Sequence, residues 1–360
     1  MELPTDLMFD IFFRLECKDI LCCKGVCRAW YNFLSDPNFS TNYARYSPPL
    51  TLLASQHRRG YGEYLFLIHV GANGEFIRRR IKPKSRRYLN RYSIVTVIGS
   101  CNGLVFLLRI TFNYSLRTLT EQVYFGNPLL GGCVALIEFK RVNKRVCYEE
   151  YKLGFVPSTD KIKLLRIGFE KDGGVLEAHI MTFREDDKWR ELKDPLTFLF
   201  PFTTGTCFNG AYHGIAKDEN VEWISTFHFG KEKCGRISKP PGLLYFSHNT
   251  RMTVLNNHLC LIDYVTHYPE MTIWTMKDYG VADSWSKDIL LRSWFPRKRF
   301  HRLLPFTTLP NGDILFLEHG GPLLSFSPKT KQFTIVQFHD AHAAIYALHA
   351  TTYTPRFYAL

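Results

Sequence analysis

The sequence lacks the features that mark membrane, secreted and zinc-binding proteins. No stretch approaches the roughly 18 consecutive apolar residues of a transmembrane helix. The N-terminus has no basic region followed by an apolar run and a small-residue cleavage site, so we expect neither a membrane partner nor secretion. None of the ten cysteines forms a Cys-x-x-Cys pair that meets a second Cys or His pair at zinc spacing. Cysteines without a secretion signal indicate reduced thiols, in the cytoplasm and/or the nucleus.

Motifs of common enzyme classes are also missing. There is no P-loop, dinucleotide-binding fingerprint or Gly-x-Ser-x-Gly nucleophile elbow. The spacing of His339, His342 and His349 matches neither a helical metalloprotease pair nor a cysteine partner. Neighbours such as Glu149-Glu150 would face opposite sides of a strand, so we interpret the acidic pairs as solvated turns. We therefore expect no catalytic residues, no metal and no cofactor.

Acidic residues are too few to balance the basic ones. The chain has 46 Lys and Arg against 33 Asp and Glu, a net charge of +13. Residues 1–47 hold five basic and six acidic residues, so the excess lies in the rest of the chain. Much of it falls in one run, which comprises Arg78, Arg79, Arg80, Lys82, Lys84, Arg86 and Arg87. Such a run is typical of a solvated loop, of a patch for an acidic partner or of a nuclear-import signal.

What is present begins with apolar residues at helical spacing in the first 40 residues. Leu7, Ile11 and Leu15 recur every four residues behind Pro4, which predicts a first helix with an apolar stripe. Asp19 is placed as the N-cap of a second helix, whose stripe comprises Ile20, Cys23, Cys27, Trp30 and Leu34. About 40 residues is near the lower limit for an independent core, so we expect these stripes to bind a partner. The alternative is a helical cap on the following domain.

From about Pro48 onward, short runs rich in Val, Ile, Phe, Tyr and Leu alternate with turn residues, which predicts antiparallel strands. Asn-Gly favours the left-handed conformations of a tight hairpin turn. Turns of this type recur at Asn102-Gly103, Asn209-Gly210, Asn256-Asn257 and Asn311-Gly312. Their separations, near 50 or near 100 residues, suit four-stranded propeller blades of roughly 40 to 50 residues. We count about six units; the alternative is a β-sandwich or two smaller sheets.

The N-terminal residues closely resemble the F-box. The matching motifs are Leu3-Pro4-Thr5-Asp6-Leu7, Arg14-Leu15, Lys18-Asp19-Ile20-Leu21, Val26-Cys27-Arg28-Ala29-Trp30 and the exit Ser35-Asp36-Pro37. Three positions, Glu16, Cys22 and Gly25, depart from the family pattern, and a glycine at position 25 predicts a break in the helix.

The resemblance implies that this module binds the Skp-type adaptor of a cullin ubiquitin ligase. The residues that it assigns to adaptor binding are Leu3, Pro4, Leu7, Ile11, Leu15, Ile20, Leu21, Val26, Cys27 and Trp30.

The remainder resembles the F-box-associated domain of a large plant family. The matching segments include Gly99-Ser100-Cys101-Asn102-Gly103-Leu104, Gly126-Asn127-Pro128, Gly154-Phe155 and Ile273-Trp274-Thr275-Met276. The two resemblances together imply a small all-α F-box (residues 1–47) followed by an all-β, propeller-like domain of about six blades (residues 48–360). They imply a substrate-recruiting subunit of a Skp-cullin-F-box (SCF) ubiquitin ligase, with an unidentified target protein bound by the β domain.

Two other functions remain open from the residues alone. The basic run favours a protein that binds nucleic acid or an acidic protein outside any ligase, although we do not expect a nucleic-acid partner. A propeller with a central channel is also compatible with a lectin or an enzyme, which would need convergent carboxylates or an aromatic platform there.

The basic run yields a first prediction. Replacing Arg78, Arg79, Arg80, Arg86 and Arg87 by Gln should leave the melting temperature nearly unchanged, because exposed substitutions usually cost within about 0.5 kcal/mol each. The same variant should lose nuclear import or an acidic partner. Fluorescence imaging of the tagged variant and its affinity-purified partners check this, and an unchanged distribution together with an unchanged partner list would leave only the solvated-loop interpretation.

Overall fold

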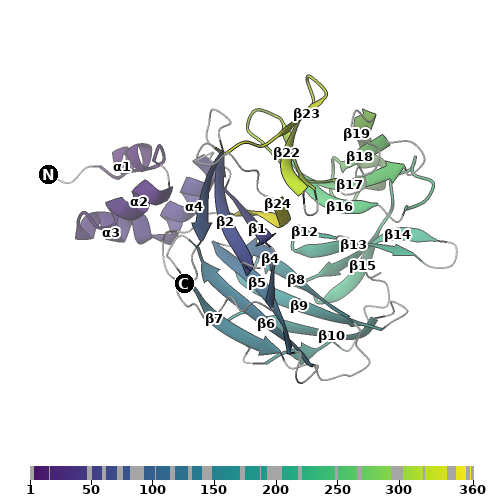
Figure 1. Cartoon of the computed structure of the whole chain (residues 1–360), viewed down its shortest axis with the longest axis horizontal. Helices are drawn as coiled ribbons and strands as arrows, with labels where there is room; N and C mark the ends of the chain where they lie inside the picture. The colour runs from purple at the N-terminus through teal and green to yellow at the C-terminus, as the bar shows by residue number, and fades with distance from the viewer. Residues whose placement is uncertain are drawn as a thin grey trace.

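A computed structural model of the chain has short helices at one end and a β domain that makes up the rest (Figure 1). It describes residues 4–15, 17–46, 51–58, 62–70, 76–81, 93–101, 103–113, 118–128, 132–139, 148–170, 175–186, 188–192, 205–217, 221–247, 250–265, 270–292, 303–318, 321–338, 346–353 and 357. The expected domain boundary between residues 47 and 48 lies outside these residues and stays a prediction. Among the described helices none is long and apolar enough to cross a membrane.

The helical module has four helices in the described residues: α1 (Thr5–Phe12), α2 (Cys17–Cys23), α3 (Arg28–Ser35) and α4 (Pro37–Tyr46). The expected break at Gly25 is confirmed, since α2 ends at Cys23 and a turn precedes α3. Asp19 lies in the first turn of α2 rather than at its N-cap, so that expectation was wrong.

Side-chain caps explain where the third and fourth helices begin. Cys27 is the N-cap of α3, and its Sγ accepts a hydrogen bond from the Trp30 N–H at 3.4 Å. The Asp36 carboxylate accepts one from the Asn38 N–H at 2.7 Å, with Pro37 as the first residue of α4. The segment Ser35-Asp36-Pro37, expected as an exit from the module, therefore begins a further helix.

Four of the sheets in the described part of the chain have four antiparallel strands each. Their strands are β4 (Ser93–Cys101), β5 (Leu104–Asn113), β6 (Thr118–Asn127) and β7 (Gly132–Phe139); β8 (Tyr148–Val156), β9 (Lys161–Phe169), β10 (Val175–Thr182) and β11 (Arg190–Glu191); β12 (Thr206–Phe208), β13 (Ala211–Lys217), β14 (Glu222–His228) and β15 (Lys233–Ile237); and β16 (Arg251–Leu255), β17 (His258–Val265), β18 (Glu270–Met276) and β19 (Trp285–Arg292).

The fifth sheet has eight strands. It comprises β20 (Leu303–Thr308), β21 (Ile314–Glu318), β22 (Gly321–Ser327) and β23 (Gln332–Ile335), together with β24 (Tyr346–Tyr353), β1 (Thr51–Arg58), β2 (Gly62–Val70) and β3 (Phe76–Ile81). Counted as sheets, the described residues form five blades where the sequence predicted about six. The difference arises because β22 pairs with β24 through Gly321↔Ala347 and Pro322↔Tyr346, which joins two four-stranded groups into one sheet.

The chain closes into a ring where its two ends meet. β1 pairs antiparallel with β24, in a register that runs from Thr51↔Tyr353 to Gln56↔Ala347. The Tyr353 hydroxyl has two possible acceptors for its one proton. These are the Gly103 carbonyl at 3.2 Å and the Asn127 side-chain oxygen at 2.9 Å. The last strand is therefore attached to the neighbouring sheet β4–β7 as well as to β1.

Two of the predicted tight hairpin turns are confirmed, whereas at Asn311-Gly312 only the glycine is left-handed, with a φ of 88°, in a longer loop between β20 and β21; Asn102 lies outside the described residues. Asn209 and Gly210 have φ values of 47° and 71°, and Asn256 and Asn257 have 48° and 59°, as a turn with two left-handed residues requires. Each pair joins the first strand of a sheet to the second, at β12–β13 and β16–β17.

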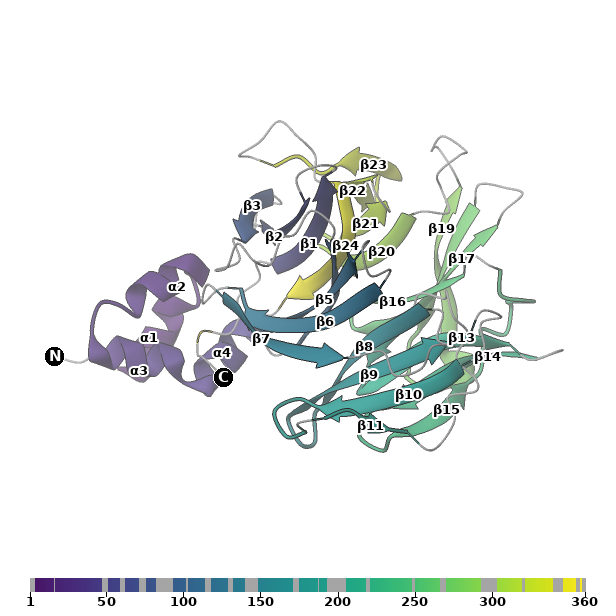
Figure 2. The same cartoon turned by 60° about the horizontal axis from the view of Figure 1, so that its bottom comes forward.

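The alternating strand directions divide the β domain into two faces. Thr51 and Tyr353 are paired at the face where the chain leaves α4 and where β24 ends, which we call the helix face. The turn at Gly103 belongs to it, since Tyr353 contacts that turn. The fourth strand of each sheet, such as β15, ends at the opposite face, where the next sheet begins; we call this the far face. In both views the helices and the C-terminus lie together, away from β13–β19 (Figures 1 and 2).

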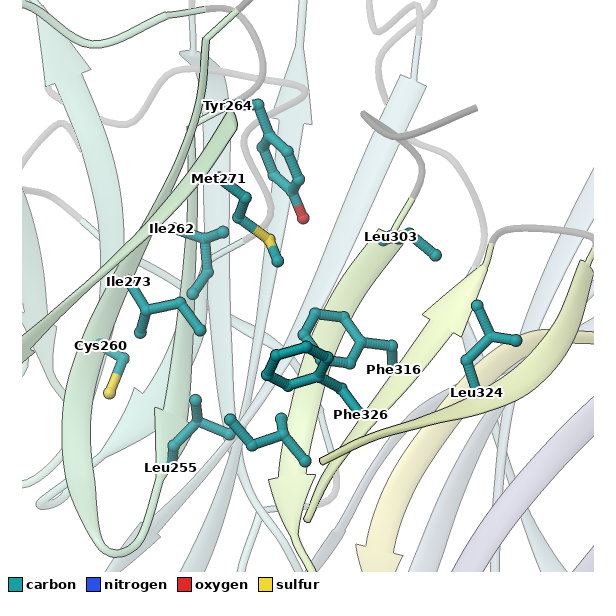
Figure 3. Close-up of a cluster of buried hydrophobic side chains, with 11 residues drawn as sticks. Leu255, Cys260, Ile262, Tyr264, Met271, Ile273, Leu303, Phe316, Leu324 and Phe326 are labelled. Carbon is teal, nitrogen blue, oxygen red and sulfur yellow. The ribbon is translucent and has the colours of Figure 1, made fainter. Parts of the chain in front are cut away.

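Apolar side chains fill the spaces between successive sheets. Figure 3 shows one such cluster, in which Phe316 and Phe326 of the eight-stranded sheet face Ile262 and Met271 of β16–β19. All four side chains are at most 2% exposed. Burying side chains of this size contributes about 1.5–3 kcal/mol each, so contact between sheets is a major source of stability.

Gly154 shows how closely adjacent sheets approach. A Cβ built at this position would lie 2.1 Å from the Phe229 ring, which is fully buried. The glycine of the Gly154-Phe155 motif is therefore required by a neighbouring sheet and not by its own backbone conformation.

We expect Gly154→Ala to destabilise the protein by at least the roughly 1–3 kcal/mol typical of overpacking, because the buried ring has to move. Thermal unfolding measures this. Adding Phe229→Leu should recover part of the loss. Gly99→Ala is the control, because a Cβ at Gly99 would lie 3.4 Å from the Leu153 side chain, an ordinary van der Waals contact, and its backbone is not in the left-handed region. Equal losses in Gly154→Ala and the control would contradict the close-packing explanation.

Candidate functional site

The helical module presents large apolar side chains to solvent. On α1, Leu7 is 51% and Ile11 is 46% exposed, one turn apart. Val26, in the turn before α3, is 64% exposed, and Tyr31 on α3 is 55% exposed. A module this small has little reason to expose four such residues unless another surface covers them.

The opposite side of the module forms its core. Phe12, Ile20, Leu34, Phe39 and Tyr43 are at most 2% exposed and belong to one cluster. Aromatic rings dominate this cluster; for example, Phe12 and Trp30 pack edge to face with centroids 5.0 Å apart. The core therefore exists within this chain, and the exposed residues are additional to it.

The residues expected to bind an adaptor divide into three sets in this structure. Pro4, Leu7, Ile11, Val26 and Cys27 are exposed, while Leu15, Leu21 and Trp30 are partly buried against the core. Ile20 is fully buried in the helical core of this structure, and its assignment as a contact residue stays a prediction. Leu3 lies outside the described residues.

Sequence reasoning missed two residues of this region. Tyr31 stands beside the matched Trp30, and its helical position, one residue from the buried stripe, was the available signal. Phe357 is a fully buried member of the helical core although it comes from the opposite end of the chain. No local pattern could have assigned it there.

The basic run is in part a strand, which corrects the expectation of a loop. Arg78, Arg79 and Arg80 lie in β3, an edge strand of the eight-stranded sheet, and pair with Ile68, Leu67 and Phe66 of β2. Charged residues on an edge strand also discourage pairing with another chain. Lys82, Lys84, Arg86 and Arg87 lie outside the described residues.

The second candidate site is a central cavity of about 770 Å³. Its lining includes residues of the first strand of every sheet and of β24, so it coincides with the ring axis. Much of the lining is hydroxylated, and the residues of this type are Thr96, Ser100, Thr206, Thr253, Thr307, Thr351, Thr352 and the two tyrosines Tyr151 and Tyr212.

One wall of the cavity carries a charged pair. The Lys152 ammonium lies 2.8 Å from the Glu150 carboxylate and 4.7 Å from the centroid of the Tyr212 ring. Burial alone lowers the pKa of Lys152, but Tyr212 and Glu150 outweigh it and raise that pKa above its ordinary value. The lysine therefore stays protonated at neutral pH.

A buried ionic network lies behind this wall. The Arg166 guanidinium is fully buried and contacts Glu149 in a bidentate pair at 2.8 and 2.5 Å and Glu177 at 2.7 Å. The Tyr151 hydroxyl connects Glu149, at 3.0 Å, with Glu121 on β6, at 2.9 Å. The network thus spans two sheets.

Glu149 and Glu150 were interpreted as a solvated turn, and this was wrong. Both lie in β8, on opposite sides of the strand as expected, but each has a basic partner. Burial raises the pKa of Glu149, whereas its hydrogen bonds with Glu121, Arg166 and Tyr151 and the charge of Arg166 lower it to about 2. A carboxylate held in this way cannot donate a proton at neutral pH. Among the described residues no group of His, Cys, Asp or Glu is arranged to hold a metal ion.

The far face also exposes apolar side chains, on a well-anchored segment between β15 and β16. Leu244 is 85% and Tyr245 is 67% exposed. The neighbouring Leu243 is buried in the core, and the Phe246 N–H donates to the Glu222 carboxylate at 2.6 Å. The Lys239 ammonium contacts the Leu244 carbonyl at 2.5 Å. These anchors fix the backbone that carries the two exposed side chains.

Comparisons with known proteins agree with this architecture. Residues 1–43 match the family model of F-box-like modules, and residues 63–350 match that of the F-box associated beta propeller domain. Two solved structures are similar at low TM-score. TolB from Acinetobacter baumannii has a TM-score of 0.47 and 10% identity, covering 85% of this chain and 67% of that one. The Aleuria aurantia fucose-specific lectin has a TM-score of 0.39 and 13% identity, covering 83% and 96%.

The similar curated proteins come from Arabidopsis thaliana. F-box protein At3g07870 is 26% identical, with 94% of this chain and 88% of that protein covered. F-box protein CPR1 is 22% identical, with 94% and 85% covered. The F-box-associated match spans most of the chain and begins 20 positions after the F-box match ends. The chain therefore belongs to the family of F-box proteins with an F-box associated beta propeller domain.

Proposed function

We propose that this protein is the substrate-recruiting subunit of an SCF ubiquitin ligase. Its F-box would bind a Skp-type adaptor, and through it a cullin, and its β domain would bind a target protein. The observation that carries the proposal is the exposed apolar surface of the helical module, which comprises Leu7, Ile11, Val26 and Tyr31. The family membership supports the same role.

The composition of this surface favours a protein partner. It combines aliphatic side chains with one tyrosine, and large apolar and aromatic residues commonly form the centre of protein interfaces. Its charged neighbours Asp10 and Arg14 pair with each other at 3.0 Å, so they add no uncompensated charge to the contact. An apolar partner surface fits this arrangement best.

The arrangement of faces supports target binding on the side away from the adaptor. The helical module is connected to the β domain at the helix face, where β1 begins and β24 ends. Leu244 and Tyr245 lie between β15 and β16 on the far face. A target bound at the far face would leave the helical module free to bind the adaptor. One chain could then hold both proteins at once.

In this role the protein contributes position and no bond-breaking chemistry. Holding a target lysine near a ubiquitin carrier raises the effective concentration of the two reacting groups. The cavity residues fit this proposal, since Lys152 is paired with Glu150 and Glu149 with Arg166. We further propose that the protein acts in the cytoplasm and/or the nucleus, where ubiquitin ligases of this kind would meet their targets.

The double variant Leu7→Asp/Ile11→Asp should lose adaptor binding. Each carboxylate would be buried without a partner at the contact, at a cost of several kcal/mol unless it relaxes. Since 1.4 kcal/mol is tenfold in affinity, we expect a loss of at least about 100-fold. Biolayer interferometry with purified Skp-type adaptor measures it.

The matched control is Val221→Asp/Ile335→Asp, which places two charges on exposed apolar positions of the β domain. Circular dichroism should show that both double variants keep their helices, because the four substituted side chains are exposed. Adaptor affinity should fall only in the first variant. Wild-type affinity in a folded Leu7→Asp/Ile11→Asp protein would refute the proposed function.

A further inference from the structure

We propose that Phe357, three positions before the end of the sequence, is part of the adaptor-binding module and couples adaptor binding to closure of the β ring. This inference rests on the proposed function and extends it by assigning a positioning residue from the far end of the chain.

Phe357 completes the helical core. Its side chain has no exposed surface and packs edge to face on Tyr43, with centroids 5.0 Å apart, and against Phe39 at 5.8 Å. The Phe357 N–H donates to the Ser40 hydroxyl at 3.3 Å. All three partners lie on α4, so this helix receives both the ring and the backbone of the C-terminal segment.

A second contact connects Phe357 with the exposed surface. The Lys24 ammonium donates to the Phe357 carbonyl, and it also lies 5.0 Å from the centroid of the Tyr31 ring. Tyr31 and Val26 are two of the exposed apolar residues. Lys24 therefore contacts both Phe357 and Tyr31, and so links Phe357 to the proposed adaptor surface.

The same segment is attached to the β ring. β24 ends at Tyr353, four positions before Phe357, and Tyr353 is buried and pairs with Thr51 of β1. The helical module is thus tied to the closing strands twice, through the chain from α4 to β1 and through the chain from β24 to Phe357. Two attachments restrict its orientation far more than one, because a single connection leaves the module free to rotate.

This double attachment predicts reciprocal coupling. An adaptor that stabilises the module with Phe357 in place should also stabilise β24 against local opening, since linkage between two equilibria acts in both directions. The orientation of the far face relative to the adaptor would then depend on the contacts of Tyr353 and Phe357.

The decisive measurement is hydrogen exchange of the full-length protein with and without purified Skp-type adaptor. In the wild type, adaptor should slow exchange in α3, α4, β1 and β24. In Phe357→Ala, free protein should exchange faster in α3 and α4, adaptor should no longer protect β24, and adaptor affinity should fall within the usual coupling range of roughly 5- to 150-fold.

Two further variants separate coupling from simple loss of folding. Phe357→Leu keeps an apolar side chain and should retain most of the affinity and the protection of β24. Lys24→Met leaves the aromatic core intact but removes the donor to Phe357, so adaptor should protect β24 less in this variant; because Lys24 also contacts Tyr31, the readout here is protection of β24 and not adaptor affinity. Exchange in β17 and β18, remote from the ring closure, should be the same in all variants.

The outcomes are distinct from those that test the proposed function. Wild-type protein that fails to bind adaptor would refute the proposed function, while faster exchange of α3 and α4 in free Phe357→Ala would still support the attachment. Wild-type adaptor affinity together with retained protection of β24 in Phe357→Ala would overturn the coupling. So would unchanged exchange of α3 and α4 in that variant.

Discussion

The pairing of β1 with β24 is the interaction on which the rest of the structure depends. It joins strands from the two ends of the chain, Thr51 to Tyr353, and so completes the four-stranded group β24–β1–β2–β3. Closing so long a loop costs entropy, but this cost grows only slowly with chain length. The stabilisation gained is larger, because closure pairs two strand edges and allows every sheet to pack against a neighbour on both sides.

Closure also decides where the two functional regions lie. Because β1 begins and β24 ends at the helix face, the helical module and Phe357 meet there, and the segment between β15 and β16 is directed to the opposite face. In the proposed role the protein would contact a ligase and a target at the same time. The alternation of strand directions in an antiparallel ring provides that separation without a dedicated spacer.

Inside the ring, charge is arranged to hold sheets in place. Arg166 is fully buried with Glu149 and Glu177, and Tyr151 extends the network to Glu121 on the preceding sheet. A buried guanidinium is tolerated only with such partners, and removing one of them leaves a buried charge uncompensated. The hydrogen bonds and the charge of Arg166 lower the pKa of Glu149 to about 2, so this carboxylate, which lines the cavity, stays ionised at neutral pH.

The sequence by itself determined the elements and their order. Helical spacing identified α1, Gly25 marked the break before α3, and Asn-Gly turns located hairpins such as β12–β13, because each of these signals acts through the backbone within a few residues. The F-box motif also identified the exposed residues Leu7, Ile11 and Val26.

Only the tertiary structure decided which residues meet across long separations. Ile20 is buried because Leu34 and Phe39 pack against it in the helical core. Glu149 forms an ion pair because β9 places Arg166 beside it. Phe357 lies in the helical core because ring closure returns the chain to the helices. The union of two groups into one sheet likewise depends on a two-residue contact between β22 and β24. The spacing of residues along the chain does not predict these contacts, since they depend on packing between segments up to 300 or so positions apart.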